Sequence, residues 1–299
     1  MINFLVSQLP NKNRTLERKI RMMYADLHVH SMYSDGTMTI EEILEEADKQ
    51  QVGLLAVSDH DMLDGARDLQ KLAKENEKYS KIKCIPSVEI NALDKERNVH
   101  ILGFYVDLQN KEFDSFIRKN RDMLDDVSIQ LIRKMEKDYD NISLEEFRQY
   151  TYDPTKGGFE ALHYLRDKGF IQELKEGFRF FQIYDCPYSC VDFPDVPTVI
   201  KQVHEAGGIA VMAHPGVTIP HKEPEAFKEE LLRYIDMGVE GIECFYPLHP
   251  KWMEELCVEI CEEKGLYITA GSDCHGGFGN AKIGETQTLV EIVTIENLI

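Results

Sequence analysis

The sequence lacks any long apolar run. Across its 299 residues, no stretch approaches the ~20 apolar residues that a membrane-spanning helix needs, so we expect no membrane segment. Residues 1–22 carry one short apolar piece followed by basic residues, the reverse order of a secretory signal. Met22 and Met23 stand directly before the first predicted strand, which leaves a mis-assigned start codon open. We therefore expect residues 1–22 to form a dispensable N-terminal arm that need not be native.

Positive charge is also scarce. The chain has 34 Lys and Arg against 53 Asp and Glu, which gives a formal net charge of −19. This balance argues against broad electrostatic adhesion to nucleic acids or anionic lipids, so we expect no stable nucleic-acid complex. A nucleotide substrate stays open, because bound cations can reverse the field locally.

Closely spaced cysteine pairs of the zinc-binding CxxC type are absent. Of the seven cysteines, two pairs are spaced by four residues and three cysteines stand alone: Cys186 and Cys190, Cys257 and Cys261, then Cys84, Cys244 and Cys274. The usage is typical of reduced thiols in a cytoplasmic protein. Internal repeats and low-complexity segments are absent as well.

What the chain does have is a motif near its start, Asp26-Leu27-His28-Val29-His30, followed by Asp35. Residues 24–29 alternate in a way that predicts a short strand. Side chains alternate across a strand, so the His28 and His30 imidazoles point the same way. Two imidazoles with a carboxylate nearby can begin a metal site. Taken alone, the motif is equally compatible with two ordinary polar histidines.

An alternation of predicted strands and helices follows this motif. The predicted strands are residues 24–29, 54–57, 82–88, 99–106, 209–212, 239–245 and 266–270, with a final β-like piece at 286–293. Helices are predicted from residue 40 and over 64–78, 196–205, 223–237 and 252–263. This order indicates a parallel α/β barrel or a doubly wound sheet, whose sites collect at the carboxyl ends of strands. His100 lies near the start of its strand, which leaves a reversed strand direction open there.

Between residues 111 and 195 the alternation breaks. A long charged helix is predicted over 111–137, and a short amphipathic helix within 157–165. We expect 111–195 to form an inserted, mainly helical lid subdomain over the strand ends. The barrel itself is then expected to consist of residues 23–110 and 196–299.

Polar residues collect at or near the predicted strand ends, and they include seven of the ten histidines of the chain. The set consists of His28, His30, Asp35, His60, Glu89, His100, His214, His249, Asp273 and His275. Imidazole and carboxylate without thiolate suit Mn²⁺, Zn²⁺ or Fe²⁺. Because the set exceeds the needs of one ion, we expect two or three divalent transition-metal ions. Such clusters clamp phosphoryl oxygens and lower the pKa of a bound water.

Four motifs carry a resemblance to a known family. Asp26–Ser31, Ser58–Asp61, Ala213–Pro215 and Ser272–Gly276 occur in the order of the motifs of the polymerase-and-histidinol-phosphatase (PHP) family of metal-dependent phosphoesterases. The resemblance implies a distorted seven-stranded β/α barrel with a trinuclear metal site. It also implies a hydrolase in which a metal-bridging hydroxide attacks phosphorus.

The resemblance further implies which residues hold each ion. One ion would be held by four residues: His28, His30, Glu89 and Asp273. A second would be bridged by Glu89 and held by His100 and His214. A third would be held by Asp35, His60 and His275. Asp273 thereby counts among the expected catalytic residues.

Substrate contacts are less defined. The chain is most similar to a subgroup that acts on nucleotides, whose inserted domain usually carries a Gly-Arg-Pro-His segment with arginine and histidine facing the substrate. Here the aligned segment is Gly157-Gly158-Phe159-Glu160, which lacks both. Lys156 or Arg179 could take over as a phosphate clamp, with solvated charge as the alternative. Two roles are open for His249: it contacts the substrate or donates a proton to it, or it supports the metal ligands from behind.

We therefore expect a cytoplasmic metal-dependent phosphoesterase acting on a small phosphomonoester, a nucleotide above all. Two alternatives remain: a histidinol-phosphate phosphatase, and a metal-binding regulatory module without turnover. His163, His204 and His221 are expected to be packed, capping or solvated histidines outside the site. The sequence leaves the oligomeric state open.

Overall fold

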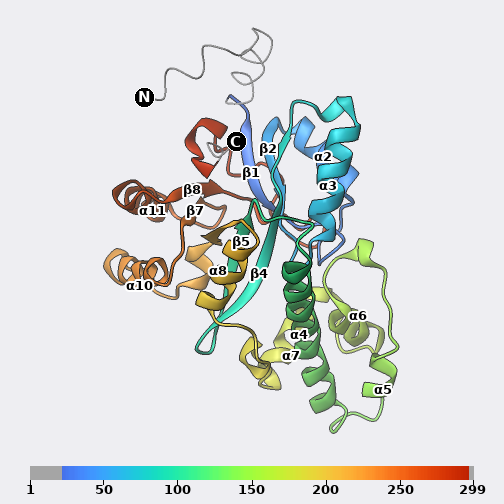
Figure 1. Ribbon diagram of the computed structural model, residues 1–299. Coiled ribbons are helices and arrows are strands. Elements are labelled where there is room, and N and C mark those ends of the chain that lie inside the picture. Colours follow the sequence, from blue (N-terminus) through green and yellow to red (C-terminus); the bar gives the residue numbers. More distant parts are fainter. Residues whose placement is uncertain (1–21, 296–299) are drawn as a thin grey trace, which may run out of the picture.

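The computed structural model describes residues 22–295, and those residues form an α/β fold with two sheets (Figure 1). The first sheet is parallel, with the order β1 (Tyr24–Val29), β2 (Val52–Val57) and β3 (Lys83–Cys84). The second sheet has the order β4 (Ser87–Asp94), β5 (Arg97–Phe104), β6 (Ile209–Met212), β7 (Gly241–Phe245) and β8 (Tyr267–Ala270). The predicted α/β class is confirmed.

Strand β5 runs antiparallel to both of its neighbours, β4 and β6, whereas β6, β7 and β8 are parallel. The reversal suspected from the position of His100 is therefore real. Because β5 runs backwards, its amino-terminal half lies beside the carboxyl ends of the parallel strands, and His100 joins the polar residues there.

Two single bridges connect the two sheets. Val29 bridges Cys274 beyond β8, and His60 beyond β2 bridges Glu89 in β4. Within residues 22–295 these are isolated bridges rather than continuous ladders. Closure into a seven-stranded barrel therefore stays a prediction.

Helices cover the two sheets. They include α2 (Ile40–Lys49), α3 (Asp64–Glu75), α8 (Val196–Glu205), α10 (Pro224–Asp236) and α11 (Lys251–Lys264), with the short η3 (Glu77–Tyr79) and α9 (Pro215–Thr218). Helix α2 begins at a capping box in which Thr39 and Glu42 satisfy each other's backbone N–H groups. Its apolar stripe is buried against β1 and β2, as an amphipathic helix requires. No helix in the described part of the chain is long and apolar enough to cross a membrane.

Residues 111–195 are mainly helical, as predicted. They form α4 (Lys111–Met135), α5 (Leu144–Phe147), η4 (Pro154–Lys156), α6 (Glu160–Asp167), η5 (Leu174–Gly177), α7 (Phe178–Ile183) and η6 (Tyr188–Cys190). The start of α4 packs on the sheet core through Phe113 and Ile117. Its end packs with α6 and α7 in a separate hydrophobic cluster that includes Leu131, Tyr164 and Phe180. Helices α4–α7 accordingly gather at one end of the molecule, apart from the helices on the sheets (Figure 1).

Two predicted elements were wrong. The strand predicted over 82–88 is two strands in different sheets, β3 and β4, with Pro86 between them. Proline cannot donate a ladder hydrogen bond, which suits a position where the chain leaves one sheet for the other. The β-like piece at 286–293 is instead a bridge at Leu289 followed by the 3₁₀ turn η7 (Val290–Ile292). The predicted N-terminal arm lies, except for Met22, outside the described residues.

Candidate metal centre

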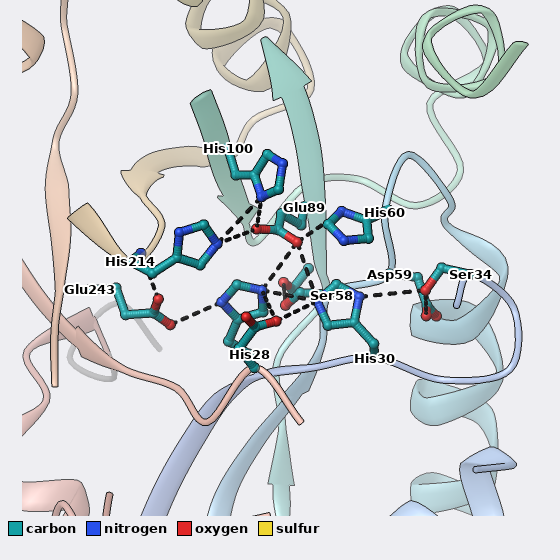
Figure 2. Close-up of polar contacts among 12 residues, drawn as sticks. His28, His30, Ser34, Ser58, Asp59, His60, Glu89, His100, His214 and Glu243 are labelled. Carbon is teal, nitrogen blue, oxygen red and sulfur yellow. Dashed lines mark hydrogen bonds and ion pairs between the residues drawn. The ribbon is translucent and has the colours of Figure 1, made fainter. Parts of the chain in front are cut away.

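The fold brings nine predicted ligands into one cluster. They come from β1 and the loop after it (His28, His30, Asp35), the end of β2 (His60), β4 (Glu89), β5 (His100), the end of β6 (His214) and the loop after β8 (Asp273, His275). Figure 2 shows the rings of His28, His30, His60, His100 and His214, which come from β1, β2, β5 and β6 or the residues just after them, around the carboxylate of Glu89. His28 and His275, which are 247 positions apart in the chain, thus belong to the same polar cluster.

Glu89 lies at the centre of this cluster and its side chain is fully buried, with 0% exposure. Its Oε1 lies 2.8 Å from His100 Nδ1 and 3.0 Å from His214 Nε2. The two imidazole nitrogens are themselves 3.4 Å apart. One carboxylate oxygen therefore faces two imidazoles at once.

The other oxygen of Glu89 faces a second group of imidazoles. Its Oε2 lies 3.2 Å from His28 Nε2, 3.2 Å from His30 Nε2 and 3.0 Å from His60 Nδ1. A carboxylate whose two oxygens face different histidine groups has the arrangement of a bridging ligand. The wrongly predicted strand over 82–88 would have placed Glu89 just after a strand end, whereas Glu89 lies inside β4.

Two further carboxylates close the cluster. Asp273 Oδ1 lies 3.1 Å from His30 Nε2 and 3.6 Å from His28 Nε2. Asp35 Oδ1 lies 3.2 Å from His275 Nε2 and 3.7 Å from His30 Nδ1. Asp35 is thus shared between two imidazoles, and Asp273, whose Oδ1 also lies 3.6 Å from His275 Nδ1, is shared among three.

Three sets of side chains offer ligand atoms that lie within 4.8 Å of one another. They are His28, His30, Glu89 and Asp273; His60, Glu89 and His100; and His30, Asp35, His60 and His275. The first set is the one that the family resemblance implies. In the second set His60 takes the place of the implied His214, and the third set adds His30 to the implied residues. His214 belongs to none of the three sets, although its Nε2 lies 3.0 Å from Glu89 Oε1.

The donor set fits divalent transition-metal ions. Three buried atoms of the cluster have no hydrogen-bond partner among residues 22–295: Glu89 Oε2, His60 Nδ1 and His214 Nδ1. A buried polar atom without a partner costs free energy, so such atoms in one place indicate a missing partner. Imidazole and carboxylate donors are those of Mn²⁺, Zn²⁺ and Fe²⁺ sites. A cation beside Glu89 would satisfy the carboxylate and orient the rings around it.

Electrostatics favours cations here. Burial raises the pKa of Glu89, but His100, His28 and His60 outweigh burial and hold it well below the usual range. Burial lowers the pKa of His60, yet Glu89 and Asp35 raise it to about 10. For His275, burial likewise lowers the pKa, and Asp35 raises it to about 9. The carboxylates therefore attract positive charge to these nitrogens, where protons and metal ions compete.

One functional residue was missed in the sequence, Glu243 in β7. Its side chain is fully buried; Oε1 accepts a hydrogen bond from His28 Nδ1 at 3.0 Å and Oε2 accepts one from the backbone N–H of His214 at 2.7 Å. A carboxylate on Nδ1 leaves Nε2 of His28 to face Glu89 and fixes the ring orientation. The available signal was an acidic residue inside an otherwise apolar strand, Gly241–Phe245.

Asp59 and Asp61, which flank His60, have different environments. Asp59 accepts hydrogen bonds from Ser31 and Ser34 at 2.6–2.7 Å, and it thereby holds the loop that follows His30. Asp61 accepts from Asn91 and Asn120 and contacts no ligand imidazole through a hydrogen bond. Of the two aspartates, Asp59 is therefore the one linked to a ligand imidazole, through Ser34, whose hydroxyl lies 3.5 Å from His30 Nδ1.

Three non-glycine residues at or beside the cluster have a left-handed backbone conformation. Asp61, His214 and Asp273 have positive φ angles of 47°, 25° and 55°. Non-glycine residues in this region cost of order 1–3 kcal/mol each and persist where the surroundings hold them in place. Here they turn the chain sharply at strand ends, so that polar side chains point inward.

His249 does not reach the cluster as a free acid or base. Its Nδ1 donates to the carbonyl of Cys244 at 3.0 Å, and its Nε2 accepts from the N–H of Gly216 at 3.0 Å. Burial also lowers its pKa. With both ring nitrogens bonded to backbone, His249 ties β7 to the loop that carries His214. This geometry fits support of the metal ligands better than substrate contact or proton donation.

Three histidines lie outside the cluster, as predicted. His163 is buried on α6, stacks on Tyr152 and pairs through Nε2 with the carbonyl of Gly157 at 2.8 Å. His204 pairs with Glu240 on the surface at 2.6 Å. His221 is exposed in the loop before α10.

A cavity of about 630 Å³ opens beside Asp35, His60 and His275. Its basic lining residues are Arg121 of α4 and Lys175 of η5, and the two predicted clamps are not among them. Lys156 is exposed in η4. Arg179 is exposed and donates to the carbonyl of Phe170 at 3.3 Å. Neither candidate clamp faces the cavity, because its backbone position in the helical segment turns it outward.

Fold and cluster together define a class, that of α/β proteins with a buried centre for divalent cations. The PHP domain model matches residues 26–178, slightly more than half of the chain, and the chain belongs to that family. The recognition made from the four motifs is confirmed.

Three curated proteins are similar to this chain over nearly their whole lengths. A 5'-3' exoribonuclease of Haemophilus influenzae is 26% identical over 90% of this chain and 96% of its own length. A phosphoribosyl 1,2-cyclic phosphate 1,2-diphosphodiesterase of Eggerthella lenta is 28% identical over 86% and 96%. A 3',5'-nucleoside bisphosphate phosphatase of Chromobacterium violaceum is 25% identical over 91% and 94%. All three relatives are named as enzymes that cleave phosphate esters. Together with the metal-dependent phosphoesterase among the solved structures, they confirm the predicted class, a metal-dependent phosphoric ester hydrolase.

Solved structures share the fold. A protein of Bifidobacterium adolescentis named as a metal-dependent phosphoesterase superposes with a TM-score of 0.73 at 24% identity, covering 91% of this chain and 94% of its own. An amidohydrolase of Chromobacterium violaceum superposes with a TM-score of 0.68 at 23% identity, covering 85% and 88%. The likeness to both extends over the helical segment as well as the sheets, given these coverages.

Proposed function

We propose that this protein hydrolyses a small phosphomonoester, a nucleotide, at a centre of two or three divalent transition-metal ions. The observation that carries the proposal is the fully buried carboxylate of Glu89, whose two oxygens lie 2.8–3.2 Å from nitrogens of five histidines. Such a concentration of donors is costly to bury unless cations pair with it. The names of the curated relatives, all enzymes of phosphate esters, support the same reaction class.

The residues divide the work in this proposal. Ions bound here would neutralise phosphoryl oxygens and lower the pKa of a coordinated water. Glu89 holds the two histidine groups around a common centre, and Asp273 and Asp35 complete the ligand sets on its outer sides. Glu243 keeps His28 in one ring orientation, so that its Nε2 stays directed at the centre.

The substrate is proposed to be small. Phosphate would bind beside Asp35, His60 and His275, and the rest of the substrate would occupy the cavity of about 630 Å³. We assign residues 111–195 the role of a lid, because α4, α7 and η6 supply one wall of that cavity. A long polyanion would be repelled by a chain of net charge −19, so mononucleotides should be preferred to oligonucleotides. We place the reaction in the cytoplasm, in keeping with the seven unpaired thiols.

A phosphate-release screen with Mn²⁺ added tests the proposal. The panel should contain nucleoside monophosphates, a nucleoside 3',5'-bisphosphate, a short 5'-phosphorylated oligonucleotide, sugar phosphates and histidinol phosphate. We expect kcat/KM to be highest for a nucleotide and lower for the oligonucleotide at the same salt concentration. Preference for the oligonucleotide would overturn the proposal of a small substrate.

The same screen separates the two alternatives. Turnover of histidinol phosphate above every nucleotide would identify a histidinol-phosphate phosphatase with the same metal centre. A folded protein that binds the ions but releases phosphate from nothing, including p-nitrophenyl phosphate, would identify a metal-binding module without turnover.

A further inference from the structure

One wall of the cavity is aromatic and comes from two distant parts of the chain. Phe159, at the start of α6, has its ring centroid 5.8 Å from those of Phe178 and Phe181 in α7. Phe278, in the loop after β8, lies 6.5 Å from Phe178. All four rings line the cavity. Phe178 is 42% exposed, so part of the side chain remains free for contact.

This aromatic wall adjoins the proposed metal centre. The centroid of the Phe278 ring lies 6.4 Å from that of His275, whose Nε2 faces Asp35. A phosphate bound beside Asp35 and His275 would therefore place the next part of its substrate against Phe278 and Phe178. The wall is positioned to contact the leaving group rather than the phosphate.

Two consecutive glycines make room for the wall. Gly157 and Gly158 have φ angles of +68° and +71°, a region that favours glycine. A Cβ atom at Gly157 would lie 2.6 Å from Phe278 Cβ, and one at Gly158 would lie 3.0 Å from Phe278 Cε2. The N–H of Gly158 also donates to the carbonyl of Asp35 at 2.7 Å. Phe278 thus occupies the space that a side chain at position 158 would need.

The charged side chains that line the cavity are three aspartates, Asp35, Asp125 and Asp185, and two basic residues, Arg121 and Lys175. Lys175 Nζ lies 5.7 Å from the centroid of Phe278, and within the described residues no carboxylate forms an ion pair with it. Arg121 lies near Asp125, with Nε 3.4 Å from Oδ1, and its charge is therefore partly neutralised. Lys175 is the basic group left to attract an anion to the aromatic wall.

We propose that Phe178 and Phe278 form a stacking platform for the nucleobase of the substrate, with Lys175 at its edge. This inference rests on the proposed function and adds the part of the substrate that is recognised. Every nucleobase has a flat π face, so stacking selects nucleotides over sugar phosphates without selecting one base. The enzyme would then identify its substrate by the presence of a base and not by a second phosphate.

The test compares substrates with and without a base. In the Mn²⁺-loaded protein, kcat/KM should be higher for all four nucleoside monophosphates than for ribose 5-phosphate. Phe178→Leu should lower kcat/KM for the nucleotides about tenfold, because one base–aromatic stack is lost. The kcat/KM for ribose 5-phosphate should stay within about twofold of the wild-type value. Phe178→Trp should keep the preference. The matched control is Phe170→Leu, the same change in a half-buried ring outside the cavity, which should alter neither value.

A binding measurement separates this inference from the proposed function. Calorimetric titration of chelator-treated protein with adenosine should show affinity that falls about tenfold in Phe178→Leu and in Phe278→Leu. If no substrate is hydrolysed but adenosine binding still depends on these rings, the proposed function fails and the platform stands. If nucleotides are hydrolysed no better than ribose 5-phosphate, or adenosine binding is the same in both variants as in wild type, the platform is wrong.

Discussion

The metal centre and the helical segment 111–195 differ in how well their chemistry could be foreseen. All nine candidate ligands, Glu89 among them, lie in one cluster. In contrast, the basic residues facing the cavity from the helical segment are Arg121 and Lys175, not the predicted Lys156 and Arg179. The comparison shows that the direction of a side chain can be predicted from the sequence at strand ends, but not in a segment of short helices and loops.

The reason is geometric. Side chains at the ends of parallel strands converge at one edge of the sheets whatever the intervening helices do. In residues 111–195, short helices and 3₁₀ turns follow one another, so a shift of one residue turns a side chain from the cavity to solvent. Four predictions, in order of decreasing expected effect, can break or sharpen this comparison.

The largest effect is expected for Glu89→Gln. The change keeps the shape of the side chain but removes the charge that two histidine groups share. We expect kcat to fall about 1,000-fold, equivalent to about 4 kcal/mol of lost transition-state stabilisation. Glu240→Gln, the same change at a surface carboxylate paired with His204, is the control. Near-normal turnover of Glu89→Gln at full metal occupancy would mean that the centre is assigned wrongly.

A smaller effect is expected for Glu243→Gln, which tests the residue that the sequence did not reveal. Its carboxylate pairs with His28 Nδ1, so the amide should hold the ring less firmly. We expect affinity for Mn²⁺ to fall about 10- to 100-fold, measured by competition with a chelator. Unchanged affinity, with circular dichroism like that of wild type, would show that Glu243 has no influence on the centre.

The third prediction contrasts two lysines of the helical segment. Lys175→Ala should raise KM for a nucleoside monophosphate about fivefold with kcat unchanged, because one exposed charge contributes only about 1 kcal/mol. Lys156→Ala should leave KM as it is. The reverse pattern would restore the clamp that the sequence suggested and would remove the difference between the two regions.

The smallest effect is expected for His204→Ala. This histidine forms an exposed pair with Glu240, and exposed pairs contribute little to stability. Both kcat/KM and the midpoint of urea unfolding should stay close to wild type, kcat/KM within about twofold. A large loss of activity here would extend the functional region well beyond the cluster around Glu89.

Much of the fold could be read from the sequence, with failures at identifiable places. Strands β1 and β6 and helix α8 begin and end where the apolar patterns predicted. The division at Pro86 was missed because 82–88 reads as one β-favouring run, and only tertiary structure shows that its halves belong to different sheets. The last β-like piece lacks a partner strand beyond one bridge, so its β propensity is not realised.

The candidate site shows the same division. Ligand positions followed from residue type at strand ends, because imidazole and carboxylate side chains are rare in buried runs. Glu243 and His249 could not be assigned in this way, since their roles depend on partners far away in the chain, His28 and Gly216. The aromatic wall likewise depends on Phe278 meeting Gly157 and Gly158, a contact that no local pattern announces.

The most direct test of the central claim is the number of metal ions that one chain binds through Glu89. The protein should be loaded separately with Mn²⁺, Zn²⁺ and Fe²⁺, desalted, and analysed by inductively coupled plasma mass spectrometry. We expect more than one ion per chain in the wild type with at least one of these metals, and at least one ion fewer in Glu89→Gln. A folded wild-type chain that binds one ion or none with every metal would contradict the account.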